Sequence, residues 1–123
     1  MSEVYDLGAT RLRVVVATEA ATVIEGELDP GGGSTSHVHT REDETVVVVE
    51  GSLSVEAGER FELGAGDAVV IPRGQRHQFG NASDALTRLY FVCTPGGLER
   101  FFRDLAAGVA PEEAAERAGL EFT

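Results

Sequence analysis

Short stretches of alternating or β-branched apolar residues fill most of the chain before residue 94. Thr22–Leu28 alternates, Thr45–Glu50 is rich in valine, and Ser52–Ala57 alternates again. Similar stretches, separated by glycine-containing turns, occur at Val14–Val16, His37–His39, Phe61–Leu63, Ala68–Pro72, His77–Phe79 and Leu86–Cys93. None of the segments between them is long enough for a crossover helix, which disfavours a parallel α/β sheet. Residues from about 11 to 94 are therefore predicted to form an antiparallel sandwich or barrel.

The periodicity changes after residue 97, where apolar residues recur at the spacing of an amphipathic helix. These residues are Leu98, Phe101, Phe102 and Leu105. Pro111 is suited to open a second short helix, and Gly108 and Gly119 to end the two helices. This helical segment spans about residues 98–119, and we expect its phenylalanines to pack on the outside of the barrel. Leu120–Thr123 is expected to be a tail, and residues 1–123 are interpreted as one domain.

Composition narrows the possible partners. The chain has 21 acidic and 10 basic residues, a net charge of −11, so nucleic acid and anionic membranes are not expected to bind it. All ten basic residues are arginine, which excludes lysine-based catalysis. Apolar runs such as Val46–Val49 are far too short to span a bilayer. The acidic start of the chain does not fit a secretory signal, and the single cysteine, Cys93, cannot form an internal disulfide; we expect a cytoplasmic protein.

All three histidines of the chain fall near strand-like segments. His37 and His39 are two residues apart, so on a strand both face the same side. Glu44 begins the strand that can return beside them, and His77 lies on a later strand behind a turn. Three imidazoles and one carboxylate converging inside a barrel would form a site for one divalent transition metal. The alternative is a set of ordinary surface or core histidines near an acid.

The context of these histidines contains two spaced motifs. The first has five residues between Gly31 and His37, then His39, four residues, Glu44, six residues and Gly51. The second has five residues between Gly66 and Pro72, then Gly74, two residues, His77, three residues and Asn81. Ten fixed positions at usages of a few per cent give a chance match on the order of 10⁻¹². The pair resembles the two signature motifs of the cupin superfamily.

This resemblance implies an all-β fold, a small antiparallel jelly-roll barrel followed here by two short C-terminal helices. It also implies that His37, His39, Glu44 and His77 are the metal ligands. The metal itself stays open among Fe, Mn, Ni, Co and Zn, because these donors suit all five. Cys93 is interpreted as a small buried apolar residue, and Asn81 as a turn-former.

A narrower resemblance concerns the stretch from His37 to Glu44 and the later Pro95-Gly96-Gly97 leading into Phe101-Phe102. These are similar to small bacterial cupins related to quercetin dioxygenase. The resemblance implies a dioxygenase that acts on a flavonol-like or other enolic aromatic molecule, with Glu44 as both ligand and general base. Phe79 shares the facing of His77 and is a candidate cavity wall.

Other residues near the predicted site are weaker candidates for contact with a substrate. Gln75 also shares the facing of His77 but lies in a turn, and Val46 and Val48, which share the facing of Glu44, are equally well explained as core. At the mouth of the site, three arginines could hold an anionic substrate or be solvated loop residues: Arg41, Arg73 and Arg76.

Two other functions remain open. Similar single-domain cupins are polyketide cyclases or isomerases that need no oxygen, and others bind a metal or small ligand without catalysis. A DNA-linked regulator is disfavoured by the charge and by the lack of a helix-turn-helix pattern. Small cupins are commonly homodimers, and Arg11–Val16 is a candidate edge strand for such an interface.

Overall fold

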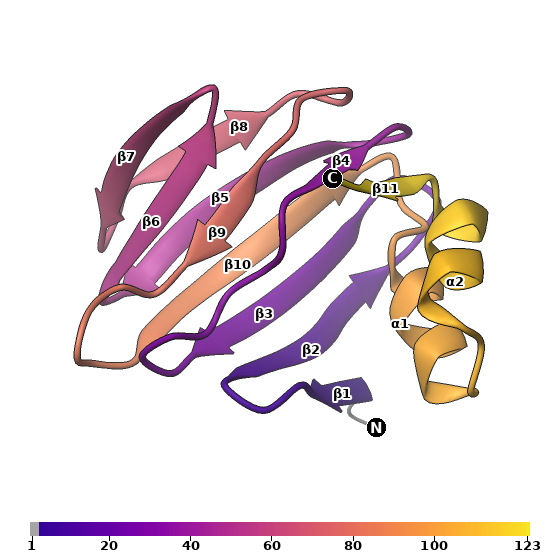
Figure 1. The fold of residues 1–123 in the computed structure, drawn as a ribbon, viewed down its shortest axis with the longest axis horizontal. Coiled ribbons are helices and arrows are strands. Elements are labelled where there is room, and N and C mark those ends of the chain that lie inside the picture. The colour runs from indigo at the N-terminus through magenta and orange to yellow at the C-terminus, as the bar shows by residue number, and fades with distance from the viewer. Residues whose placement is uncertain (1–2) are drawn as a thin grey trace.

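The computed structural model describes residues 3–123, which form facing antiparallel sheets with two helices at one side (Figure 1). The elements are β1 (Glu3–Asp6), β2 (Thr10–Ala17), β3 (Thr22–Leu28), β4 (His37–His39), β5 (Asp43–Glu50), β6 (Ser52–Ala57), β7 (Glu59–Gly64), β8 (Ala68–Ile71), β9 (Gln78–Gly80), β10 (Thr87–Thr94), α1 (Glu99–Ala106), α2 (Pro111–Ala118) and β11 (Leu120–Phe122). The larger sheet has the order β1-β2-β3-β10-β5-β8, and a smaller sheet has the order β7-β6-β9. A separate pair joins β11 to β4.

The main core lies between the two sheets, because alternate residues of each strand point inward. In β5, for example, Val46 and Val48 are buried, as expected for residues that share the facing of Glu44. Burying one such side chain fully contributes about 1.5–3 kcal/mol. The cluster comprises Leu28, Val46, Val48, Leu53, Val55, Leu63, Ile71, Phe79 and Leu89.

Tight turns at glycines set the lengths of these strands. Gly51, between β5 and β6, has φ of +82°, and a Cβ there would lie 2.5 Å from the carbonyl oxygen of Leu86. Gly74, in the turn before His77, has φ of +85°. Only glycine adopts such angles at no steric cost. These positions explain why the two spaced motifs contain glycine.

The helices α1 and α2 cover one side of the barrel, where a second core forms (Figure 1). Its buried members are Leu12, Ile24, Cys93, Leu98, Phe101, Ala114, Ala115, Ala118 and Leu120. Gly119, with φ of +75°, ends α2 in the left-handed conformation, as predicted. The all-β jelly-roll fold with two short C-terminal helices is confirmed. None of the helices within residues 3–123 is long and apolar enough to cross a membrane.

Two short strands differ from the sequence-based prediction. Leu120–Phe122 was expected to be a tail, but it forms β11 and pairs with β4, so that Leu120 lies opposite His39 and Phe122 opposite His37. Glu3–Asp6 forms β1 and pairs with β2. The expected edge segment Arg11–Val16 is therefore an interior strand, and β1 is the edge. Both additions follow from backbone hydrogen bonding to an open strand edge, which satisfies donors and acceptors without requiring a long apolar pattern.

Candidate metal centre

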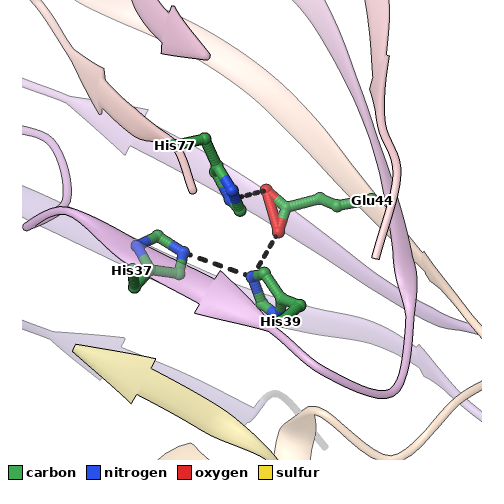
Figure 2. Close-up of side chains that lie close together, drawn as sticks. All are labelled: His37, His39, Glu44 and His77. Carbon is green, nitrogen blue, oxygen red and sulfur yellow. Dashed lines mark hydrogen bonds and ion pairs between the residues drawn. The ribbon is translucent and has the colours of Figure 1, made fainter. Parts of the chain in front are cut away.

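The three histidines and Glu44 come from three separate segments that meet inside the barrel (Figure 2). His37 and His39 are the two ends of β4, and Glu44 is the second residue of β5. His77 precedes β9 and forms an antiparallel bridge with His37, with backbone N···O distances of 3.0 and 2.9 Å. One potential ligand atom from each of the four residues lies within 4.8 Å of the others. The structure thus brings together all four residues predicted from the sequence in a cluster that could hold a metal ion.

Each imidazole is held by an oxygen at its Nδ1 atom. Nδ1 of His37 lies 2.7 Å from the carbonyl oxygen of Thr35, and Nδ1 of His77 lies 3.0 Å from that of Gln75. Nδ1 of His39 lies 2.7 Å from Oε1 of Glu42. Because these oxygens only accept hydrogen bonds, the network assigns a proton to each Nδ1. Each Nε2 is then left to face the centre of the cluster.

The imidazole Nε2 atoms and the Glu44 oxygens that face the centre of the cluster are better placed to bind a metal ion than to hydrogen-bond with one another. Nε2 of His77 is buried and has no hydrogen-bond partner, and its nearest acid oxygen, Oε1 of Glu44, is 3.8 Å away. Nε2 of His39 lies 2.8 Å from Oε2 of Glu44 and 3.2 Å from Nε2 of His37. A buried polar atom without a partner is costly, and a cation at the centre would satisfy it. Three imidazole nitrogens and one carboxylate are donors typical of divalent transition metals.

Protonation equilibria in the metal-free site follow from the same contacts. Burial lowers the pKa of His37 to about 4, so its ring is neutral near pH 7. Burial alone would also lower the pKa of His39, but hydrogen bonds to Glu42 and Glu44 outweigh it and raise that pKa to about 9. Burial would raise the pKa of Glu44, but His39 and His77 lower it to about 2. In the metal-free protein the protonated ring of His39 therefore supplies positive charge where a metal cation would otherwise bind.

The bend between β4 and β5 is more ordered than its polar sequence suggests. The stretch Arg41-Glu42-Asp43 is entirely charged, yet Glu42 is buried against His39, with 2% of its surface exposed. Asp43 pairs with Arg73 at 3.2 Å. Sequence reasoning gave Glu42 no role, and its only signal was its position three residues after His39.

A cavity of about 300 Å³ opens beside the cluster. His37, His39 and Glu44 form its polar wall. The rest is mostly apolar and includes Leu12, Ile24, Leu28, Phe79, Phe91, Leu98, Phe101, Phe102, Leu120 and Phe122. Two larger hollows, of about 480 and 600 Å³, lie outside this space, and neither contains more than one residue of the cluster. We therefore place the candidate site in the 300 Å³ cavity.

The aromatic lining confirms one expectation and corrects another. Phe79 lines the cavity beside His77, with ring centroids 5.1 Å apart, as its facing predicted. Phe101 and Phe102 were expected only to pack on the outside of the barrel, but both line the cavity. They do so because α1 lies across the side of the barrel and directs its apolar face inward.

The remaining candidates lie outside the lining of this cavity. Gln75 lies outside the cavity, and its carbonyl oxygen accepts the bond from His77. Arg41 donates to the carbonyl oxygen of Arg117 at 2.8 Å, and it does not line the cavity, nor do Arg73 and Arg76. Asn81 is buried and donates to the carbonyl oxygen of Ala85 in its own turn, as expected of a turn-former, and also to that of Leu28 at the end of β3.

The thiol of Cys93 lies next to the cluster without belonging to it. Sγ is fully buried and donates to Oε2 of Glu44 at 3.9 Å. Burial and the charge of Glu44 raise the pKa of this thiol, so it stays protonated near neutral pH. A protonated thiol is not a metal ligand, which agrees with a donor set of nitrogen and oxygen.

Comparison with known proteins assigns the class. Residues 24–93 match the cupin domain family, and the chain belongs to that family. A conserved protein with a double-stranded β-helix domain from Klebsiella pneumoniae superposes with a TM-score of 0.72, covering 97% of this chain and 88% of that chain at 23% identity. That likeness concerns the fold alone.

Two Streptomyces proteins are similar in sequence. The tetracenomycin polyketide synthase protein TcmJ of Streptomyces glaucescens is 34% identical over 92 residues, which are 72% of this chain and 62% of that protein. The polyketide synthase CurC of Streptomyces cyaneus is 40% identical over 67 residues, which are 54% of this chain and 44% of that protein. The chain thus matches less than two thirds of the length of either relative.

Proposed function

We propose that this chain is a metal-dependent cupin enzyme that closes rings in a polyketide or a similar enolisable small molecule. The observation that carries the proposal is the position of the cluster, in which two of the three imidazoles, His37 and His39, and Glu44 form the polar wall of a mostly apolar cavity. The sequence likeness to polyketide synthase proteins supports this substrate class. It favours ring closure over the flavonol dioxygenase that the narrower resemblance implied.

In this proposal His37, His39, Glu44 and His77 hold one divalent ion. The ion would supply Lewis-acid chemistry, polarising a carbonyl oxygen of the substrate. The apolar wall does the rest of the binding. Phe79 and Phe91, whose ring centroids are 5.5 Å apart, offer flat surfaces to a planar substrate.

Glu44 is proposed to move the proton that ring closure requires. A carbon between two carbonyl groups loses a proton to the carboxylate, and the resulting enolate carbon forms a bond to a third carbonyl carbon, five atoms further along the same chain, which closes a six-membered ring. The proton on Glu44 then passes to the oxygen of that carbonyl, which restores the base, and loss of water completes an aromatic ring. Because a carboxylate is a weak base, this route suits acidic carbons such as those of poly-β-ketones.

The test uses the metal-loaded full chain and an aryl-substituted 1,3,5,7-tetracarbonyl compound, the shortest such chain that can close a six-membered ring by this route, with mass spectrometry of the product in air and under nitrogen. We expect a cyclised product that has lost water, formed equally fast with and without oxygen and not formed after chelation. Oxygen atoms in the product, or a rate that depends on oxygen, would instead support the dioxygenase. Binding of the compound and metal without any product would support a non-catalytic binding protein.

A further inference from the structure

His39 differs from the other two imidazoles in what holds its outer nitrogen. His37 and His77 donate from Nδ1 to main-chain carbonyl oxygens. His39 donates to a carboxylate, Oε1 of Glu42, at 2.7 Å. Both partners are enclosed, with 5% and 3% of their side-chain surface exposed. The acceptor at Nδ1 of His39 is therefore a charged carboxylate, whereas the acceptors at Nδ1 of His37 and His77 are neutral carbonyl groups.

A carboxylate in this position is costly unless something balances it. Taking an ion out of water has an effective cost of several kcal/mol even after the protein relaxes. The other charged neighbour of His39 is Glu44, which is also an acid, so a protonated His39 ring would offset only one of the two negative charges. Two buried carboxylates that bracket one imidazole together carry the charge that a single divalent cation would neutralise.

We infer that Glu42 is a positioning residue of the metal centre, which orients His39 and supplies the second of the two negative charges that balance a divalent ion. The inference rests on the metal-binding part of the proposed function and needs no particular reaction. A carboxylate that accepts from Nδ1 keeps the proton on that nitrogen and leaves Nε2 free to bind the metal. It also makes Nε2 more basic and therefore a stronger metal ligand.

Glu42→Gln and Glu42→Ala separate the two contributions. The amide keeps the size of the side chain and an oxygen that accepts from Nδ1 of His39, but it lacks the charge; alanine lacks both. Glu99 offers a matched control, because its carboxylate is also buried and accepts from the hydroxyl of Thr22 at 2.7 Å. Glu99→Gln therefore removes a buried charge without touching the cluster.

The experiment measures zinc affinity by competition with a chromophoric chelator, together with the visible spectrum of the cobalt-substituted protein. We expect Glu42→Gln to bind zinc about 10–100-fold more weakly than the parent, Glu42→Ala to bind more weakly still, and both to shift the cobalt bands. Glu99→Gln should match the parent in both readouts. Unchanged affinity in Glu42→Gln, or an equal loss in Glu99→Gln, would overturn the inference.

A second measurement needs no variant, in case those proteins do not fold. In the zinc-loaded parent, nitrogen-15 spectra of the histidine rings should show His39 with its proton on Nδ1 and zinc on Nε2. Zinc on Nδ1 would overturn the inference while leaving the metal centre intact. A parent protein that binds no zinc would overturn the metal centre itself and the inference with it.

Discussion

Glu44 touches both parts of the proposed chemistry, since its oxygens lie 2.8 Å from Nε2 of His39 and 3.8 Å from Nε2 of His77. Three imidazoles remain in Glu44→Gln, so we expect this variant to keep its metal. If the carboxylate is the base, turnover at equal metal occupancy should fall by about 10²–10⁴-fold. Unchanged turnover at matched occupancy would make Glu44 a ligand only. Glu99→Gln is the control for loss of a buried acid.

The ionisation of the cluster predicts a peak in the stability of the metal-free protein. Between pH 6.5 and 9 the folded protein holds a proton on His39 that the unfolded chain has released, so stability falls as pH rises. Between pH 6.5 and 4 the unfolded chain holds a proton on His37 that the folded site excludes, so stability falls as pH falls. Below pH 4.5, the lowered pKa of Glu44 adds a further loss.

Denaturant unfolding in the presence of a chelator measures this profile. Stability should be highest near pH 6.5 and fall by about 1.4 kcal/mol per pH unit on either side, the slope for one proton. Zinc should remove the loss above pH 6.5, because binding keeps His39 without its extra proton in the folded state. A flat profile for the metal-free protein would contradict the assigned contacts of His39.

The four residues of the cluster could be predicted from strand alternation together with the resemblance to the cupin motifs, whereas Glu42 could not. Alternation on a strand places His37 and His39 on one face, and the matching motifs add Glu44 and His77. The role of Glu42 depends on how the bend after β4 folds back, which no short-range pattern specifies. The same polar stretch of sequence is compatible with a solvated loop and with a bend that buries one of its carboxylates.

Among the elements, the strands with clear alternation were predicted closely, and two short strands near the ends of the chain were not. The observed bounds of β3, β4 and β6 agree with the sequence pattern. The strands β1 and β11 have four and three residues, too few to show a period, and they form because an open strand edge lies beside them. The lining role of α1 was also missed, because an amphipathic pattern identifies the apolar face of a helix but not the surface that this face covers.

The contribution of α1 to the cavity wall is tested most easily at Phe102. This residue is half-buried, lines the cavity and packs against Tyr5 with ring centroids 5.6 Å apart. Phe102→Ala should lower stability by about 1–3 kcal/mol, less than the 3–5 kcal/mol of a fully buried phenylalanine. It should raise KM for an aromatic substrate while leaving metal content unchanged. Val70→Ala, at a residue 60% exposed outside the cavity, is the control, and an equal KM in both variants would remove Phe102 from the binding wall.

At the scale of the whole molecule, the structure changes where a partner subunit would bind. The homodimer expected from the sequence remains a prediction, but β2 is covered by β1, so the open edges of the larger sheet are β1 and β8. Exposed apolar residues lie on both, Val4 at 55% and Val70 at 60%. Light scattering at micromolar concentration should give about twice the 13.0 kDa of one chain. A mass of one chain would contradict the dimer.

The most direct measurement is the metal content of the protein purified without chelator or added metal, and of the same protein after incubation with zinc and removal of the excess. The account predicts one divalent ion per chain, held by His37, His39, Glu44 and His77, and its loss in His39→Ala, with Glu99→Gln retaining it. The identity of the native ion would also separate Lewis-acid chemistry from redox chemistry. A parent protein that retains no zinc, or a His39→Ala protein that retains a full equivalent, would contradict it.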